Sequence, residues 1–380
     1  MRTLLIEGWR QIAHSYAIVN QYHLLELRKH PDLTVYHRDV PFASPQWKRV
    51  AGLFGPERDA AIMAVPPPPA DLHPDVVLRM GFPHFFRADS SARRTFAWGT
   101  SEFGFIEPAA IGDRCSAFDA LSTATAGIIA CSTWAASGFI NSGAKRENVT
   151  VIPCGVDPAI FYPPTPDQRA ALRKQLGWEG KLVLLNISAM TRNKGVSLLL
   201  QAVAALAPKY PNLQVILKGS DTLYPSSKFA QTNFASLSPA EAAAVGPRIG
   251  YTGEALSEAR MAALYQAADA YVSPYRAEGF NLPVLEAAAC GLPVVCTRGG
   301  STDDFTTDAF ALGVDSTSSV DSTGRTWLEP SLPMLIEHVD RALTDHAFRA
   351  RVAVAGPEWV RSRFTWKLAV DRLLAHLFPT

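Results

Sequence analysis

The stretch that decides the fold is KLVLLNISAMTRNKGVSLLLQAVAALAPKY, residues 181–210. Its first part, 181–188, is a nearly continuous apolar run, which is typical of a strand buried on both faces of a parallel sheet. Its last part, 196–210, repeats apolar side chains at helical spacing. A short connection joins the two parts. The stretch therefore predicts one strand–helix unit of a parallel α/β sheet.

The same alternation extends to both sides of this stretch. Before it, short β-like runs predict strands at 3–7, 33–37, 75–80, 94–98, 127–131 and 149–153, and a helical pattern covers 15–29. After it, we expect strands at 214–219, 271–273 and 292–297, and helices at 257–268, from Pro283, and at 358–377. Strand–helix alternation implies parallel sheets with crossover helices, so two such series predict two doubly wound domains.

Prolines crowd residues 155–168, between the two series. They predict a boundary there, with one Rossmann-like domain at 1–160, a second at 161–357 and a C-terminal helix at 358–380. In open parallel sheets, ligands bind beyond the carboxyl ends of the strands. The loops that follow the predicted strands are therefore where functional residues are expected.

The composition favours a soluble globular protein. The chain has 380 residues, of which 48% are hydrophobic, and this supports sizeable cores. Lys and Arg number 36 against 35 Asp and Glu, a balance that does not favour nucleic acid as a partner. The five cysteines show no metal-ligand or redox spacing, which favours reduced thiols in a cytoplasmic protein. Signal-peptide and membrane-span patterns are not apparent, and peripheral contact with the inner face of a membrane stays open.

Two cations follow the strand expected at 181–188. Arg192 and Lys194 lie in the connection, and Gly195 opens the next helix. Cations at a strand–helix turn, next to a helix N-terminus, predict a site for an anion such as a phosphate. Ordinary surface charge is the alternative interpretation. Gly219, at the end of another strand, permits close approach to the backbone, although an ordinary turn has the same pattern.

Two glutamates bracket the start of another helix in the stretch EGFNLPVLE, residues 278–286. Pro283 suits the first helical position, so Glu278 precedes the loop and Glu286 is expected in the first helical turn. Free N–H groups at a helix start favour anions, and carboxylates accept hydrogen bonds from sugar hydroxyls. The alternative is that Glu286 only complements the helix dipole. A turn at Gly299 and Gly300 lies on the same sheet edge, and together these loops match a nucleoside diphosphate that carries a sugar.

Other nucleotide and metal sites lack their motifs. The first strand is not followed by G-x-G-x-x-G, and no P-loop pattern occurs in the sequence. No histidine cluster has metal-ligand spacing. Asp303 and Asp304 could hold Mg²⁺, but two adjacent acids in a polar loop are more typical of a solvated turn. We therefore expect no metal and no cofactor. The expected donor substrate is a nucleotide-diphosphate sugar.

Residues 274–295, together with Lys194 and Gly195, resemble the retaining nucleotide-sugar glycosyltransferases of the GT-B fold, a family that includes bacterial mannosyltransferases and sucrose synthases. The similarity is strong over residues 125–300 and weaker over 1–120. It implies two facing Rossmann-like domains, of which the first binds the acceptor and the second the donor. It also implies that the final helix packs back on the first domain.

The resemblance implies roles for single residues of the donor site. Lys194 would hold the donor diphosphate, Glu278 would face the transferred sugar, and Glu286 would accept hydrogen bonds from the ribose hydroxyls. Sugar and phosphate would contact the loop residues Gly279, Phe280, Asn281 and Leu282. The base would be bordered by Gly219, Tyr251 and Gly253. The family usually has an arginine upstream of the lysine, where this chain has Ala189, and Arg192 is the candidate replacement.

Acceptor-binding residues are expected in the first domain. Gly8, Trp9 and His14 follow its first strand, and aromatic rings beside polar groups suit stacking on a sugar ring. The family often has a histidine after a later strand of this domain, and the stretch DVVLRMGFPHFF offers His84 or Arg79 for that position. The same aromatic residues are compatible with the edge of a core.

The expected function is transfer of a hexose from a nucleotide-diphosphate sugar to a glycan or lipid-linked acceptor, with retention of anomeric configuration. Lys194, Arg192 and Glu278 are the expected catalytic residues. One alternative is a nucleotide-sugar epimerase of the same fold, which would release an epimerised sugar without an acceptor. The other is a non-catalytic subunit that binds nucleotide sugars, an interpretation that Ala189 keeps open.

Overall fold

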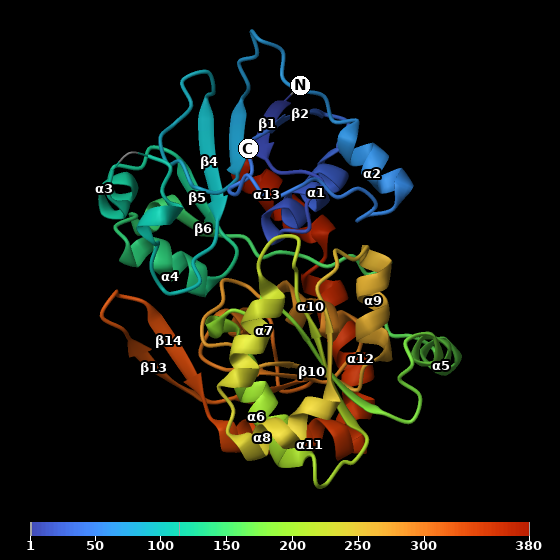
Figure 1. Ribbon diagram of the computed structural model, residues 1–380. Helices are drawn as coiled ribbons and strands as arrows, with labels where there is room; N and C mark the ends of the chain where they lie inside the picture. The colour runs from blue at the N-terminus through green and yellow to red at the C-terminus, as the bar shows by residue number, and fades with distance from the viewer. Residues whose placement is uncertain (1, 114, 380) are drawn as a thin grey trace. The chain divides into compact units, whose positions relative to one another are not determined.

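The computed structural model describes residues 2–113 and 115–379 (Figure 1). The chain forms two compact units, Met1–Gly155 with Phe364–Thr380, and Val156–Arg363. Each unit contains a six-stranded parallel sheet, so the predicted α/β class with two Rossmann-like sheets is confirmed. The chain changes unit at 155/156 and 363/364, whereas the predicted boundaries lie at 160/161 and 357/358. None of the helices in the described ranges combines the length and apolar character that crossing a membrane requires.

The sheet of the first unit has the order β2-β1-β3-β4-β5-β6, and every neighbouring pair is parallel. The strands are β1 (Arg2–Gly8), β2 (Leu33–Asp39), β3 (Val76–Met80), β4 (Arg94–Gly99), β5 (Gly127–Ala130) and β6 (Val149–Val151). The helices of this unit are α1 (Ser15–Leu27), α2 (Pro56–Met63), α3 (Ala117–Ser122), α4 (Thr133–Asn141) and α13 (Trp366–Leu377). Because β1 lies between β2 and β3, a topological switch point lies beside Gly8, where such sheets bind ligands.

The C-terminal helix belongs to the first unit. Tyr22 of α1 stacks on Trp366 of α13 with 4.6 Å between ring centroids, and the Arg94 guanidinium donates to the Leu377 carbonyl at 3.0 Å. The prediction of one helix over 358–377 is wrong, because the chain forms α12 (His346–Arg363) and then α13. Thr365 interrupts the helix, since its side chain accepts a hydrogen bond from the Leu368 N–H and caps the start of α13.

The sheet of the second unit has the order β12-β11-β10-β7-β8-β9, again parallel throughout. The strands are β7 (Leu182–Ile187), β8 (Leu213–Lys218), β9 (Ile249–Thr252), β10 (Ala270–Ser273), β11 (Val294–Thr297) and β12 (Ala311–Val314). The helices are α5 (Pro166–Gln175), α6 (Val196–Leu206), α7 (Ser226–Ala235), α8 (Pro239–Val245), α9 (Glu258–Ala267), α10 (Leu282–Ala289), α11 (Leu332–Thr344) and α12. Here β7 lies between β8 and β10, so the switch point lies at the loops that follow β7 and β10.

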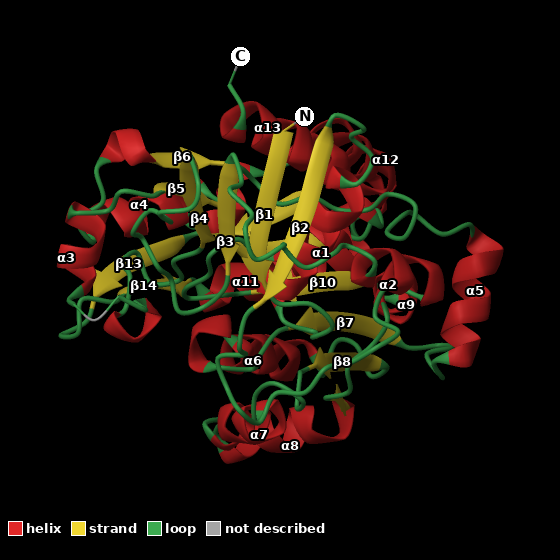
Figure 2. Ribbon diagram, turned by 90° about the horizontal axis from the view of Figure 1, so that it is seen from above, coloured by secondary structure: helices red, strands yellow, loops and turns green. Residues whose placement is uncertain are grey.

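Helices cover both sides of this second sheet (Figure 1). The contacts between helices form one group from α6, α7, α8 and α11, and another from α5, α9, α10 and α12. Between β12 and α11 the chain adds an antiparallel hairpin that we did not predict, β13 (Ser316–Val320) and β14 (Thr326–Pro330). Figure 2 shows this hairpin apart from β7, β8 and β10 of the same unit.

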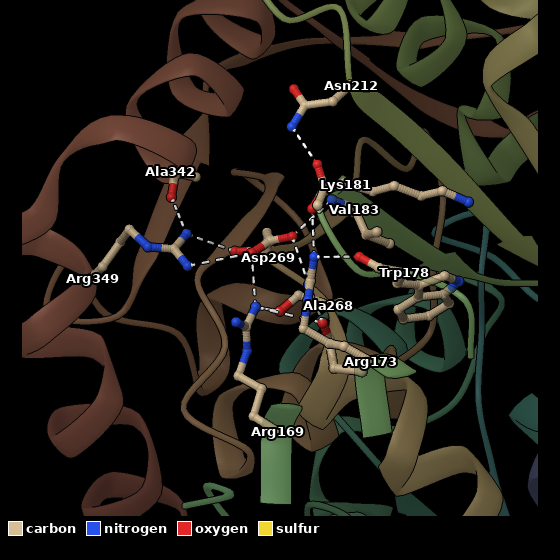
Figure 3. A network of polar contacts seen from close by, with 12 residues as sticks. Arg169, Arg173, Trp178, Lys181, Val183, Asn212, Ala268, Asp269, Ala342 and Arg349 are labelled. Atoms are coloured by element: carbon tan, nitrogen blue, oxygen red, sulfur yellow. Dashed lines mark hydrogen bonds and ion pairs between the residues drawn. The ribbon is translucent and has the colours of Figure 1, made fainter. Parts of the chain in front are cut away.

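A buried carboxylate fixes the amino edge of the second sheet, away from the loops that carry the candidate site. Asp269, immediately before β10, accepts hydrogen bonds from Arg169 at 2.7 Å and Arg173 at 3.1 Å, both from α5 (Figure 3). It also accepts from the Val183 N–H of β7 at 2.8 Å, and Arg349 of α12 lies 3.8 Å away. The network therefore ties two helices to the two central strands.

Candidate active site

Two loops of the second unit are joined at the carboxyl edge of its sheet. A 3₁₀ turn, Arg192–Lys194, follows β7, and the loop with Glu278 follows β10. The side-chain amide of the buried Asn193 donates to the Ala277 carbonyl at 3.0 Å, and the Asn193 carbonyl accepts from the Arg276 N–H at 2.7 Å. The two loops therefore form one surface of fixed geometry.

Gly195 makes this close approach possible. It has a φ of 67°, in the left-handed region, and a Cβ atom there would lie 1.8 Å from the Pro274 carbonyl oxygen. Any other residue would push the loop after β10 away from the turn that carries Lys194.

Lys194 and Glu278, which we predicted as separate ligands of diphosphate and sugar, contact each other. The Lys194 ammonium forms an ion pair with Oε2 of Glu278. The two side chains are only 12% and 16% exposed, so the pair is largely removed from water. An anionic group that approaches Lys194 would compete with Glu278 for the same ammonium group.

Glu286 lies one residue further along its helix than predicted. Asn281 has a φ of 75° and precedes α10, which begins at Leu282 and not at Pro283. Glu286 is therefore beyond the first turn, and complementing the helix dipole does not explain it. Its Oε2 accepts a hydrogen bond from the Tyr265 hydroxyl at 2.7 Å. Burial raises the pKa of Glu286 to about 7, although the Tyr265 hydrogen bond lowers it.

The loop between the two glutamates offers its backbone more than its side chains. Phe280 is 6% exposed and its ring packs on Phe305, with 4.9 Å between centroids. The Asn281 amide donates to the Ser273 hydroxyl at 3.0 Å, which holds the left-handed residue in place. Gly279 is buried and Leu282 is half-buried. The predicted contacts of this loop with a sugar or phosphate would therefore involve backbone N–H groups.

The residues predicted to border the base do come together, at the ends of β8 and β9. The Gly219 N–H donates to the Thr252 carbonyl at 2.8 Å, and Asp221 joins the group by donating its N–H to the Gly253 carbonyl at 2.8 Å. The Tyr251 hydroxyl donates to the Asp221 carboxylate at 3.0 Å.

Sequence reasoning missed two members of this group, Asp221 and Lys218. Lys218 lies at the end of β8, where it is 5% exposed, and burial lowers its pKa to about 8. Its ammonium donates to the Gly219 carbonyl. A lysine closing an otherwise apolar strand, QVILK, was the available signal.

Arg192 is directed toward the unpredicted hairpin. Its guanidinium lies over the Trp327 ring, 5.2 Å from the centroid, and the Trp327 indole N–H donates to Asp321 at 2.8 Å. The hairpin is itself fixed next to the site, because Glu329 accepts two hydrogen bonds from Arg276 at 2.7 and 2.9 Å. Trp327 therefore helps to set the position of the cation that we predicted in place of the family arginine.

The turn after β11 is held by hydrogen bonds within the protein. The Gly299 N–H donates to the Asp303 carboxylate at 2.8 Å. A Cβ at Gly300 would lie 2.6 Å from the Tyr275 hydroxyl oxygen, so the turn packs closely on the loop after β10. In residues 2–113 and 115–379, no group of three or more His, Cys, Asp or Glu side chains is arranged to hold a metal ion.

The first unit places the predicted acceptor residues around the switch point at Gly8. Trp9 is 1% exposed, and its indole N–H donates to the Pro41 carbonyl at 2.9 Å, so this ring belongs to the core and is not open to stack on a sugar. His84 is 3% exposed, and its Nε2 lies 3.3 Å from the Tyr16 hydroxyl. The Nδ1 of His14 accepts from the Tyr16 N–H at 3.2 Å and starts α1. Burial lowers the pKa of both histidines to about 4, so they are neutral near pH 7.

Comparison with known proteins gives the family. The model of the family described as Glycosyl transferases group 1 matches residues 168–359, half of the chain. The chain belongs to this family. The resemblance drawn from the sequence is thereby confirmed.

Two curated relatives of this group 1 glycosyltransferase share 28% and 29% identity with it over part of the chain. Mannosylfructose-phosphate synthase of Agrobacterium fabrum is 28% identical over 237 residues, 61% of this chain and 48% of that protein. A GDP-mannose-dependent monoacylated alpha-(1-6)-phosphatidylinositol monomannoside mannosyltransferase of Corynebacterium glutamicum is 29% identical over 230 residues, 58% of this chain and 54% of that protein. The chain thus spans about half the length of these relatives.

Solved structures of other members share the fold. Sucrose-phosphate synthase of Thermosynechococcus elongatus aligns with a TM-score of 0.70 at 18% identity, covering 100% of this chain and 99% of the other. HepE of Anabaena, solved in complex with UDP-glucose, aligns with a TM-score of 0.69 at 15% identity, covering 99% of each chain. At such identities the likeness concerns the fold, and it confirms the GT-B fold class.

Proposed function

We propose that this protein is a glycosyltransferase that moves a hexose from a nucleotide-diphosphate sugar to a glycan or lipid-linked acceptor with retention of anomeric configuration. The observation that carries the proposal is the fixed surface in which Asn193 joins the Lys194 turn to the Glu278 loop. HepE structures with UDP and UDP-glucose, and relatives named for GDP-mannose, support a sugar nucleotide as donor. The cytoplasmic location and peripheral membrane contact remain predictions.

The proposed roles follow the chemistry of the donor. Lys194, with Arg192, stabilises the negative charge that grows on the leaving diphosphate, and Glu278 accepts hydrogen bonds from the transferred sugar. Glu286 accepts from the ribose hydroxyls with the oxygen that Tyr265 does not use. In the transfer step the acceptor oxygen bonds to the anomeric carbon, the bond from that carbon to the diphosphate breaks, and the diphosphate takes the acceptor proton. Removing one such charge-stabilising group typically lowers turnover by about 10²–10³.

The test compares wild type with Lys194→Met and Glu286→Gln on a panel of nucleoside diphosphates and their sugars. Calorimetry measures donor binding, and product analysis with a mixture of acceptors measures transfer and the anomeric configuration. We expect Lys194→Met to lose most turnover and Glu286→Gln to lose donor affinity. Wild-type binding and turnover in both variants would show that the site is assigned wrongly. Epimerised free sugar without an acceptor would identify an epimerase, and donor binding without turnover a binding subunit.

A further inference from the structure

The first unit contains a cavity to which the proposed function gives no role. It has a volume of about 350 Å³ and lies at the carboxyl ends of β1, β2 and β3. Its walls are mainly apolar, and they come from the loops after β2 and β3: Val40, Pro41, Phe42, Phe82, Pro83 and Phe85. Its volume falls at the lower end of the range for small-molecule sites, about 300–1,000 Å³.

The cavity exists because this part of the sheet is covered by loops. The connection from β3 to β4, residues 81–93, contains no helix, and Figure 2 shows β1 and β2 with no helix in front of them. Arg38, Glu7 and Arg79 are neighbours in register on β2, β1 and β3, so their side chains lie on one face of the sheet. Glu7 and Arg79 line the cavity.

The floor of the cavity is polar and its charges are paired, because Arg79 also lies 3.6 Å from the Asp89 carboxylate. Arg79 Nε donates to Oε2 of Glu7 at 3.1 Å, and Arg38 donates to Oε1 at 2.6 Å. The side chains of Glu7 and Arg79 are only 14% and 19% exposed. A carboxylate paired with arginines can still accept a hydrogen bond from a hydroxyl group, and the set of Arg38 and Arg79 with Glu7 and Asp89 has no net charge to attract an ion.

The walls are fixed before any ligand arrives. The His84 N–H donates to the Ala110 carbonyl, and the Gly112 N–H donates to the His84 carbonyl, both at 2.7 Å. A Cβ at Gly112 would lie 2.4 Å from the Phe85 ring, so that ring packs directly on the glycine. Phe85 lines the cavity and is 45% exposed, so part of its ring is open to solvent.

We propose that this cavity binds a flat apolar ring carried by the acceptor, with a polar substituent of the ring directed to the Glu7–Arg79 pair. Rigid aromatic walls around a small cavity suit a ring better than a flexible chain, because stacking orders few rotatable bonds. His84 lines the cavity and belongs to the predicted acceptor residues, so the cavity and the predicted acceptor site share this histidine. This inference rests on the proposed glycosyl transfer and names a class of acceptor for it.

The experiment measures binding without a donor, so it does not depend on turnover. Matched methyl, octyl and 4-nitrophenyl glycosides of glucose, mannose and galactose are titrated calorimetrically into wild type, Ala43→Trp and Ala51→Trp. Ala43 is an exposed residue of the cavity lining, and Ala51 is an exposed residue outside it, which makes Ala51→Trp the matched control. Nucleoside diphosphate binding is measured on the same three proteins.

For at least one sugar, we expect the nitrophenyl glycoside to bind wild type and the control at least about tenfold more tightly than the methyl glycoside. Ala43→Trp should remove this advantage while nucleoside diphosphate binding stays unchanged. Equal affinity for nitrophenyl and methyl glycosides overturns the proposal, as does an octyl glycoside that binds as tightly as the nitrophenyl one. An advantage that survives Ala43→Trp also overturns it. Failure of all three proteins to bind any nucleotide would instead count against the proposed function.

Discussion

The variant Glu286→Gln tests two properties of this buried carboxylate: its effect on the free energy of unfolding and its contribution to donor binding. The pKa of Glu286 is raised from 4.5 to about 7, so between these pH values the folded protein holds a proton that the unfolded chain has released. Stability then falls as pH rises from 4.5 and stops falling above pH 7. Each pKa unit corresponds to about 1.4 kcal/mol, so the full cost is about 3 kcal/mol above pH 8 and less than about 1 kcal/mol at pH 5.

Glutamine does not titrate, and its carbonyl can still accept the Tyr265 hydrogen bond. We therefore expect the difference in unfolding free energy between Glu286→Gln and wild type to shift in favour of the variant by about 2.5 kcal/mol from pH 5 to pH 8. Urea unfolding at both pH values measures the shift. The slope of the unfolding free energy against urea concentration must be the same for the variant and the wild type. Glu254→Gln is the control, since Glu254 is exposed and pairs only loosely with Arg260 at 3.4 Å.

The same variant should lose donor affinity. A ribose hydroxyl bonded to a carboxylate contributes about 1.5–3 kcal/mol, so replacing the carboxylate should weaken nucleoside diphosphate binding by at least about tenfold at pH 8. A 2′,3′-dideoxynucleoside diphosphate should bind wild type and variant equally. A stability difference that does not change with pH would refute the reasoning about the buried carboxylate. Equal loss for ribose and dideoxyribose ligands would refute the ribose contact.

Three further predictions concern the framework of the second unit. Asp269→Asn should lower the unfolding free energy by about 3 kcal/mol in urea, because it leaves partly buried arginines without their carboxylate, while the control Asp371→Asn in an exposed pair should cost less than about 1 kcal/mol. Asn193→Ala should reduce kcat by at least about tenfold in transfer assays, since it frees the Lys194 turn from the Glu278 loop, and unchanged kcat would contradict that coupling. Trp327→Leu should raise the donor KM several-fold by releasing Arg192, with no further effect in an Arg192→Ala background.

The sequence predicted the parts of the fold that rest on local periodicity. The apolar run at 181–188 and the helical pattern at 196–210 appear as β7 and α6. A continuous apolar run of this length is typical of a strand with both faces buried, which occurs in parallel sheets covered by helices. The hairpin at 316–330 escaped prediction because β13 reads STSSV, which lacks an apolar alternation. The break between α12 and α13 was not predicted because the apolar periodicity of a helix continues across it. Only the cap at Thr365 marks the start of a new helix.

The sequence predicts which loops form the candidate site, but it does not predict which side chains of these loops contact each other. Strand ends fixed which loops share an edge, and this brought Lys194 and Glu278 into one region. Their direct ion pair joins residues 84 positions apart, and no local pattern contains it. The burial of Trp9 was equally hidden, because an aromatic residue after a strand suits a core edge as well as a binding surface.

The ion pair explains how the proposed site could be ready for a donor without holding free charges. A lone buried lysine or glutamate is costly, and removing one partner of a buried pair typically costs about 3–5 kcal/mol. Pairing Lys194 with Glu278 lets both charges stay in a poorly hydrated loop that Gly195 and Asn193 hold rigid. In the proposed reaction the diphosphate replaces Glu278 as the partner of Lys194, and the sugar hydroxyls replace Lys194 as the partner of Glu278. A complete sugar nucleotide replaces both contacts of the ion pair, whereas a nucleoside diphosphate alone replaces only the contact of Lys194. The proposed site therefore favours binding of the intact donor over its product.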